Sequence, residues 1–256
     1  MRPFAMFPAL MRIPRIHVPA PLRAGDILQL PEQAGEHLAR VLRLESGHPL
    51  ILFNGDGTEY DARLAALAKR SVTAEVGARR EISRESPLQL TLVQGVARGE
   101  KMDWVLQKAT ELGVARIVPV ITERTEVRLD EERGNRRLNH WAQVVASACE
   151  QCGRNVLPEI LPPQKLMHYC ASLTNADTPA RFALLPEADT GPRELGPLPQ
   201  GALLLIGPEG GLSDHDIAVA RNAGFRGLRL GPRILRTETA GLAAIAALQA
   251  MAGDFV

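Results

Sequence analysis

The segment Leu203-Leu-Leu-Ile-Gly-Pro-Glu-Gly-Gly-Leu-Ser213 carries the strongest structural signal in the chain. Its apolar part predicts a buried strand over residues 203–206, and its glycine-rich part predicts a tight loop. Ser213 and Asp216 fit a capping box, so a helix is expected over residues 213–223. Glycines let a backbone approach a ligand closely, and a helix N-terminus supplies unpaired N–H groups. The stretch therefore predicts either a ligand-binding loop at the carboxyl end of a strand or a tight turn that needs glycine dihedrals.

A second stretch repeats this pattern: Leu228-Arg-Leu-Gly-Pro-Arg-Ile-Leu-Arg-Thr-Glu-Thr-Ala240. It predicts a strand over residues 227–230, a Gly-Pro loop, and a helix with Thr237 as N-cap and Glu238 in its first turn. Because successive parallel strands end on the same edge of a sheet, the two loops are expected to wall one pocket. The final helix, residues 238–251, is almost wholly apolar, which predicts burial and indicates a subunit interface.

The chain from residue 88 onward alternates strands with helices. Besides the elements above, we expect strands over 88–96, 117–121 and 182–185 and helices over 101–113 and 139–153. This order predicts an α/β domain over residues 88–256 with a mostly parallel sheet.

The first part of the chain consists of shorter pieces. Strands are expected over 26–30, 49–53, 58–64 and 71–76, with a turn at Asn54-Gly-Asp-Gly57 and a short helix over 31–44. This pattern predicts a small β-barrel over residues 11–82, followed by a linker over 83–87 that ends in Pro87. Met11 is expected to be the true start, because the first ten residues are broken by prolines.

Composition excludes several classes of protein. The 256 residues are 45% hydrophobic and 23% charged, as in a globular protein, and no apolar run reaches the roughly 18 residues of a membrane span. Three Cys cannot build a disulfide framework, so a cytoplasmic protein is expected. The net charge of +1 argues against tight binding to arbitrary RNA. Only four of the 30 basic residues are Lys, which suits phosphate recognition but is equally explained by genome base composition.

Other chemistry-bearing motifs are weak. Walker A, G-x-G-x-x-G and G-x-S-x-G motifs are missing, which disfavours a nucleotide enzyme of the common types. Cys149-Glu-Gln-Cys152 lies inside a helical pattern, and Cys170 is the third thiol. A four-Cys zinc site cannot be built from three thiols, although His ligands could complete one, so we expect no metal and two small residues packed on a helix face.

Four blocks in order resemble the SPOUT class of S-adenosylmethionine-dependent RNA methyltransferases, and more narrowly the small-subunit (16S) ribosomal RNA uridine-N3 methyltransferases. The first is Met11-Arg-Ile-Pro-Arg-Ile16. The second is Arg98-Gly-Glu-Lys-Met102 with Gln107-Lys-Ala-Thr-Glu-Leu-Gly113, and the third is Ala148-Cys-Glu-Gln-Cys-Gly-Arg-Asn155. The two loops described above form the fourth, and the resemblance runs from Met11 to the end of the chain.

The resemblance implies a PUA-like RNA-binding barrel, a SPOUT domain with a deep trefoil knot, and a homodimer with its cofactor pocket near the subunit interface. The implied partner is small ribosomal subunit RNA, with a decoding-region uridine as target. The implied cofactor is S-adenosylmethionine, held by Leu184, Leu185, Gly207, Pro208, Glu209, Gly210, Gly211, Leu230, Gly231, Ile234, Leu235, Arg236, Thr237, Thr239 and Ala240.

Uracil N3 carries a weakly acidic proton, so the site should remove that proton or stabilise the anion. Arg236 is the first candidate for the stabilising cation, and Glu238 is a candidate for orienting it or taking the proton, with helix capping as the alternative role. Contacts to RNA are expected from Arg12, Arg15, Arg124, Arg136 and Arg154.

Two other functions remain open at this point. One is a SPOUT enzyme that methylates a transfer RNA ribose 2′-OH, whose loops would look similar. The other is a ribosome-assembly or RNA-binding protein that holds no cofactor, against which the twin glycine loops count.

Overall fold

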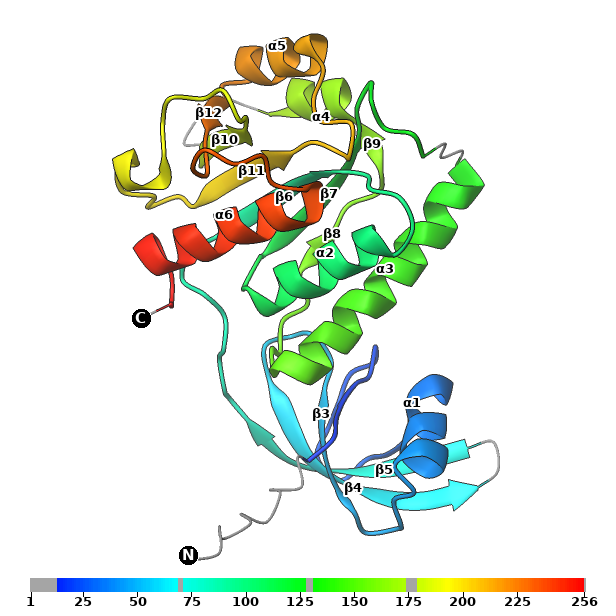
Figure 1. The fold of residues 1–256 in the computed structure, drawn as a ribbon. Coiled ribbons are helices and arrows are strands. Elements are labelled where there is room, and N and C mark those ends of the chain that lie inside the picture. The colour runs from blue at the N-terminus through cyan, green and yellow to red at the C-terminus, as the bar shows by residue number, and fades with distance from the viewer. Residues whose placement is uncertain (1–12, 69–70, 128–130, 174–178, 256) are drawn as a thin grey trace, which may run out of the picture. The chain divides into compact units, whose positions relative to one another are not determined.

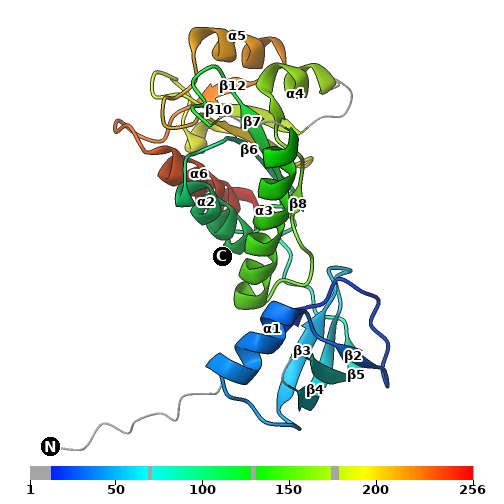
Figure 2. The same ribbon diagram turned by 90° about the vertical axis from the view of Figure 1, so that its right-hand side faces the viewer.

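The computed structural model describes residues 13–68, 71–127, 131–173 and 179–255. The chain divides into two compact units, Met1–Ser83 and Arg84–Val256, each with its own sheet (Figures 1 and 2). Within the described residues, none of the helices is both long and apolar enough to cross a bilayer.

The first unit is a five-stranded sheet with one short helical segment. The sheet order is β1-β3-β4-β5-β2, with β1 parallel to β3 and the other pairs antiparallel. Alternate residues of β4, including Tyr60, Ala62 and Leu64, point into the core, as the period of a strand requires. The elements are β1 (Arg15–His17), β2 (Ile27–Gln29), α1 (Glu32–Glu36), the π-helical η1 (His37–Val41), β3 (Pro49–Phe53), β4 (Glu59–Ala68) and β5 (Ser71–Arg80).

The second unit is a seven-stranded sheet between two layers of helices. The order is β12-β10-β11-β6-β7-β8, with β9 also on β7, and every pairing is parallel. Helices α2, α3 and α6 cover one face, and α4 and α5 cover the other (Figures 1 and 2). The elements are β6 (Leu90–Gly95), α2 (Glu100–Glu111), β7 (Arg116–Ile121), α3 (Glu131–Cys152), β8 (Glu159–Ile160), β9 (Gln164–Lys165), α4 (Leu166–Ser172), β10 (Ala180–Leu184), the 3₁₀ turn η2 (Pro192–Glu194), β11 (Ala202–Ile206), α5 (Asp214–Asn222), β12 (Arg226–Leu228) and α6 (Thr237–Ala252).

The sequence missed several short elements. It did not predict β1, β8, β9 or α4. It also placed the start of α3 at residue 139, whereas the helix begins at residue 131, because the first turns of α3 are polar and carry no apolar stripe that would indicate a helix. The helix expected over residues 31–44 is only five α-helical residues followed by a π-helical turn.

The linker expected over residues 83–87 is mostly packed structure. The Arg84 guanidinium donates to the carbonyl oxygen of Gly153 at 2.9 Å, and the Ser86 hydroxyl donates to Oε1 of Gln249 at 2.7 Å. Residues 84–86 therefore belong to the second unit, in which Ser86 is buried and Arg84 remains exposed.

Candidate functional site

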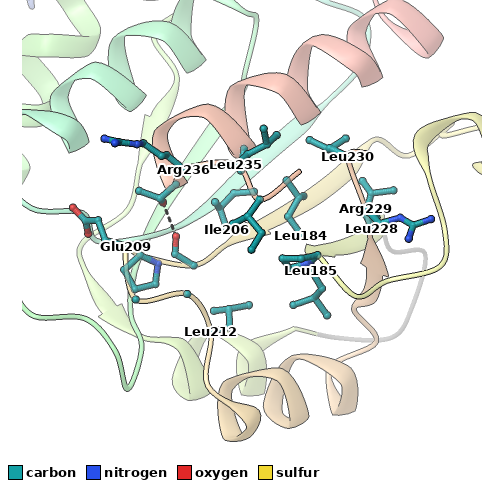
Figure 3. A pocket seen from close by; sticks show the side chains of 18 of the residues that line it. Leu184, Leu185, Ile206, Glu209, Leu212, Leu228, Arg229, Leu230, Leu235 and Arg236 are labelled. Atoms are coloured by element: carbon teal, nitrogen blue, oxygen red, sulfur yellow. Dashed lines mark hydrogen bonds between the residues drawn. The ribbon is translucent and has the colours of Figure 1, made fainter. Parts of the chain in front are cut away.

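The two glycine-rich loops meet in one cavity at the carboxyl edge of the sheet. Strands β10, β11 and β12 are neighbours, so the segments that follow them come together there. The cavity has a volume of about 740 Å³ (Figure 3). Its lining contains every residue of the predicted cofactor set except Thr239, and it also contains Glu238, Lys101, Arg124, Ile206, Leu212 and Leu228.

Thr239 is the exception because it lies on the exposed side of the first turn of α6. Residues 237, 238 and 240 of the same turn line the cavity. Because an α-helix turns by about 100° per residue, Thr239 points away from the face of α6 that lines the cavity. The prediction treated residues 234–240 as one block and so did not allow for this change of direction.

The cavity has an apolar end and a charged end. Leu184, Leu185, Leu228 and Leu230 lie at one end with Arg229 at its margin, whereas the side chains of Glu209 and Arg236 lie at the other end (Figure 3). The apolar end is suited to a flat, poorly hydrated ring, and the charged end is suited to a polar reacting group. The cavity therefore separates a binding region from a region for chemistry.

Two glycines let the segments at this edge approach each other closely. A Cβ placed on Gly95, the last residue of β6, would lie 2.5 Å from the backbone nitrogen of Pro208. A Cβ on Gly207 would lie 2.8 Å from the backbone carbon of Gly211. Any side chain at either position would force the glycine-rich loop away from its place, so these glycines set the shape of the cavity wall.

We expect Gly95→Ala to destabilise the second unit by about 1–3 kcal/mol and to weaken cofactor binding, because the added methyl group meets fixed backbone. Gly134→Ala is the matched control, since a Cβ there has open space and Ala is favoured over Gly inside a helix. Both Trp residues, Trp104 and Trp141, lie in the second unit, so urea unfolding followed by Trp fluorescence reports on this unit alone. Equal stability of the two variants would contradict the prediction.

Thr237 joins three elements instead of capping a helix through its side chain. Its Oγ1 donates to the carbonyl oxygen of Gly207 at 2.5 Å and accepts from Nε2 of the buried Gln94 at 2.9 Å. The N-cap of α6 is Arg236, so the prediction of Thr237 as N-cap was wrong by one residue. The hydroxyl is used for tertiary contacts that bind the start of α6 to the ends of β6 and β11.

The Ser213 cap of α5 is confirmed. The Ser213 hydroxyl accepts from the backbone N–H of Asp216 at 3.0 Å, and Oδ2 of Asp216 accepts from the backbone N–H of Ser213 at 3.0 Å. This reciprocal pair fixes the exit of the glycine-rich loop.

Glu209 is held in the ionised state at the charged end. Its Oε1 accepts from the backbone N–H of Arg98 and from Nζ of Lys101, both at 3.1 Å. Partial burial raises the pKa of Glu209, but hydrogen bonds from its own backbone N–H, from Arg98 and from Lys101 outweigh burial, so the net shift of the pKa is downward.

The side chains of Arg236 and Glu238 each have a polar group that forms no hydrogen bond with the described residues. The Arg236 side chain is exposed, and its guanidinium forms no hydrogen bond or ion pair with any residue that the structure describes. In Glu238, Oε2 is buried and lacks a hydrogen-bond partner among the described residues. Buried polar atoms are nearly always paired in folded proteins, and this oxygen has the capacity to accept a further hydrogen bond.

Two of the arginines expected to contact RNA are engaged inside the protein. The guanidinium of Arg15 pairs with the buried Glu59 at 2.6 Å and lies 5.1 Å from the centre of the Phe53 ring. Arg154 is 4% exposed, and it donates to Glu85 and to the carbonyl oxygens of Thr110 and Val114. Neither side chain is presented to solvent, so a contact of Arg15 or Arg154 with RNA would require these internal pairs to break.

The other three arginines predicted to contact RNA lie in different parts of the chain. Arg124 lines the cavity and donates to the carbonyl oxygen of Gly210 at 3.0 Å. Arg136 is exposed on α3 and pairs with Glu132 at 2.5 Å. Arg12 lies outside the described residues.

None of the three cysteines, all of which are among the described residues, forms a disulfide. Cys149 and Cys152 lie in the last turn of α3, and Cys170 is buried in α4, where burial raises its pKa to about 11. Among the residues that the structure describes, no group of three or more His, Cys, Asp and Glu could hold a metal ion.

Comparison with known proteins assigns both units. The model of an RNA methyltransferase domain matches residues 84–249, and the model of an RNA methyltransferase PUA domain matches residues 30–77. Ribosomal RNA small subunit methyltransferase E of Buchnera aphidicola (from Acyrthosiphon pisum) is 32% identical over 95% of this chain and 96% of its own length.

Solved structures agree with this assignment. Ribosomal RNA small subunit methyltransferase E from Neisseria gonorrhoeae, bound to S-adenosylmethionine, has a TM-score of 0.87 at 38% identity. A protein from Legionella pneumophila described as a methyltransferase, also with bound S-adenosylmethionine, has a TM-score of 0.90 at 41% identity. Both matches cover 95% of this chain and 100% of the other. The chain belongs to the ribosomal RNA small subunit methyltransferase E family.

Proposed function

We propose that the protein transfers a methyl group from S-adenosylmethionine to N3 of a decoding-region uridine in small-subunit (16S) ribosomal RNA. The observation that carries this proposal is the single cavity formed by both glycine-rich loops, with an apolar end and a charged end. Family membership supports the RNA class and the cofactor. The lining also holds the unpartnered cation of Arg236 and, among the described residues, an unpartnered carboxylate oxygen of Glu238, and these two groups support attack by a nitrogen that must lose a proton.

The residues present fit the cofactor. The leucine-lined end suits an adenine ring, and the crowded glycines allow backbone N–H and C=O groups to approach its polar edges. The residues that would hold it are Leu184, Leu185, Gly207, Pro208, Gly210, Gly211, Leu230, Gly231, Ile234, Leu235, Thr237 and Ala240. S-adenosylmethionine held there would supply an electrophilic methyl group with a neutral thioether as its leaving group.

The chain supplies position and electrostatics for methyl transfer. Arg236 contacts the uracil carbonyl oxygens and stabilises the negative charge that develops when N3 loses its proton. The unpartnered Oε2 of Glu238 accepts that proton. Both groups come from the N-terminal end of α6, so one helix positions the cation and the base together.

We propose that the second unit is a knotted SPOUT domain and that the sheet of the first unit closes as a PUA-like barrel. β12 lies at the sheet edge, yet α6, which follows it, begins against Gly207 at the end of β11. The chain between them bonds to the β10–β11 connection, through Arg229 N–H and the carbonyl oxygen of Thr190. This passage across an earlier loop supports a trefoil knot.

We propose that the protein works in the cytoplasm as a homodimer. One face of α6 is buried on the sheet, whereas Leu242, Ala243, Ala246 and Ala247 on the other face are only half-buried. Trp104 of the neighbouring α2 is 45% exposed. A half-buried apolar stripe of this kind is suited to a second copy of the chain.

We expect sedimentation velocity to give a dimer for the intact chain, because a partner would cover this stripe. Leu242→Glu places a charge in the proposed interface and should shift the protein towards monomer. Thr239→Glu, on the exposed side of the same helix and outside the stripe, is the control. A monomeric wild-type protein would contradict the dimer.

The substrate class is tested with labelled S-adenosylmethionine and two RNA sources. Small ribosomal subunits that lack the modification should accept label, and transfer RNA should not. Label in transfer RNA alone would favour a transfer RNA enzyme. A protein that binds no S-adenosylmethionine in calorimetry and transfers no label would be an assembly factor, and the proposal would be withdrawn.

A further inference from the structure

Lys101 is a cation of the cavity that belongs to the block Arg98–Met102, for which the sequence predicted no role. It lies in the first turn of α2, just after β6, and it lines the cavity. Its side chain is 40% exposed, and its Nζ lies 3.1 Å from Oε1 of Glu209. Lys101 therefore reaches the charged end from a different element than Arg236 does.

The carboxylate of Glu209 holds the ammonium of Lys101 in place, and Glu209 is itself held by a backbone hydrogen bond. Oε1 of Glu209 is held by the backbone N–H of Arg98 as well as by Lys101. Nζ of a lysine has three N–H donors, and Glu209 accepts one of them in the described contacts. The remaining donors can serve a ligand at the end of the cavity where Glu209 and Arg236 lie (Figure 3).

The other cations of the lining are placed differently. Arg229 lies beside Leu228, at the end away from Glu209 (Figure 3). Arg124 donates to the carbonyl oxygen of Gly210 and so supports the loop. Lys101 and Arg236 are thus two cations that approach the charged end from two sides, one from α2 and one from α6.

We infer that Lys101 is a catalytic residue whose ammonium contacts a carbonyl oxygen of the target uracil and stabilises the anion formed at N3. This inference rests on the proposed function. The negative charge of the anion is shared by N3 and the two flanking carbonyl oxygens, which point to opposite sides of the ring. Two cations from different elements match that distribution better than one cation does.

The proton and electrons balance without a chemical change in Lys101. The N3–H bond breaks, its electron pair stays on N3, and the proton goes to Glu238. That pair then forms the bond to the methyl carbon. Lys101 keeps its own protons throughout, and Glu209 positions Lys101 without serving as base, which agrees with the lowered pKa of its carboxyl group.

The test is the pH dependence of single-turnover methylation of small subunits by wild type, Lys101→Met and Lys101→Arg. Loss of the ammonium should lower the rate about 100-fold at neutral pH, as loss of one oxyanion donor does. The deficit should shrink as pH rises, because a higher pH ionises N3 without the help of the cation. Lys101→Arg keeps the charge and should restore much of the rate and the wild-type pH profile.

Lys108→Met is the matched control, because Lys108 lies on the same helix and pairs with Glu111 outside the cavity. It should leave rate and pH profile unchanged. Binding of S-adenosylmethionine to Lys101→Met, measured by calorimetry, should stay within about threefold of wild type, a difference of less than 1 kcal/mol.

Two outcomes would overturn the inference while leaving the proposed function intact. One is a rate for Lys101→Met that falls equally at all pH values. The other is a fall that follows loss of cofactor binding, which would make Lys101 a support for the loop. If the wild-type protein forms no 3-methyluridine, the proposed function is wrong. Failure of the proposed function is therefore distinguished from failure of the inference about Lys101, which shows only in the Lys101 variants.

Discussion

Arg236→Ala is expected to reduce single-turnover methyl transfer by about 100- to 1,000-fold while the protein stays folded. The guanidinium is exposed, lines the cavity and has no partner among the described residues, so its removal leaves no buried group unpaired. The loss should appear in the chemical step, because the cation acts on charge that develops only when N3 loses its proton.

The control for this variant is Arg221→Ala, which removes an exposed arginine at the end of α5 outside the cavity. It should keep the wild-type rate. Unfolding by urea should be unchanged in both variants, because surface substitutions of this kind cost within about 0.5 kcal/mol. A near-normal rate for Arg236→Ala would remove Arg236 from the mechanism.

Arg154→Ala is expected to lower the free energy of unfolding of the second unit by about 3 kcal/mol. Arg154 is 4% exposed and donates to Glu85 at 2.5 Å and to two backbone carbonyl oxygens at 2.9 Å. Breaking a buried pair leaves the remaining charge and both carbonyls without their partner, which costs about 3–5 kcal/mol, and we take the lower end because Glu85 is partly exposed.

Arg116→Ala is the control, because Arg116 forms an exposed pair with Glu159 at 2.7 Å. Exposed pairs contribute about 0–1 kcal/mol, so this variant should unfold almost as wild type does. Urea unfolding followed by Trp fluorescence compares the two. If Arg154→Ala were as stable as wild type but failed to bind small subunits, the sequence-based prediction of an RNA contact would be right after all.

Arg154 illustrates what a single sequence leaves open. An arginine in a family block is equally suited to a phosphate and to a buried carboxylate, and the choice depends on Glu85, 69 residues away. Arg15 is the same case, since its partner Glu59 comes from another strand. Local patterns do not encode such long-range pairs.

The parts that sequence predicted well are local. The strand–loop–helix unit around Gly207 and the cap at Ser213 follow from residues within four positions of each other. Their meeting in one cavity followed from the rule that parallel strands end on one edge of the sheet. The place of Lys101 and Arg124 in the cavity wall was missed. Lys101 lies in the helix that follows β6 and Arg124 lies in the turn that follows β7, and the sequence did not show that these strands follow β11 on one side of the sheet.

Methylation of uridine at N3 is tested most directly by the identity of the modified nucleoside. Small subunits lacking the modification are methylated with labelled S-adenosylmethionine, and their 16S ribosomal RNA is digested to nucleosides and separated. We expect label in 3-methyluridine. Label in a ribose-methylated nucleoside would contradict this expectation, because the cation and base assigned to Arg236 and Glu238 would then serve an oxygen nucleophile rather than uracil N3.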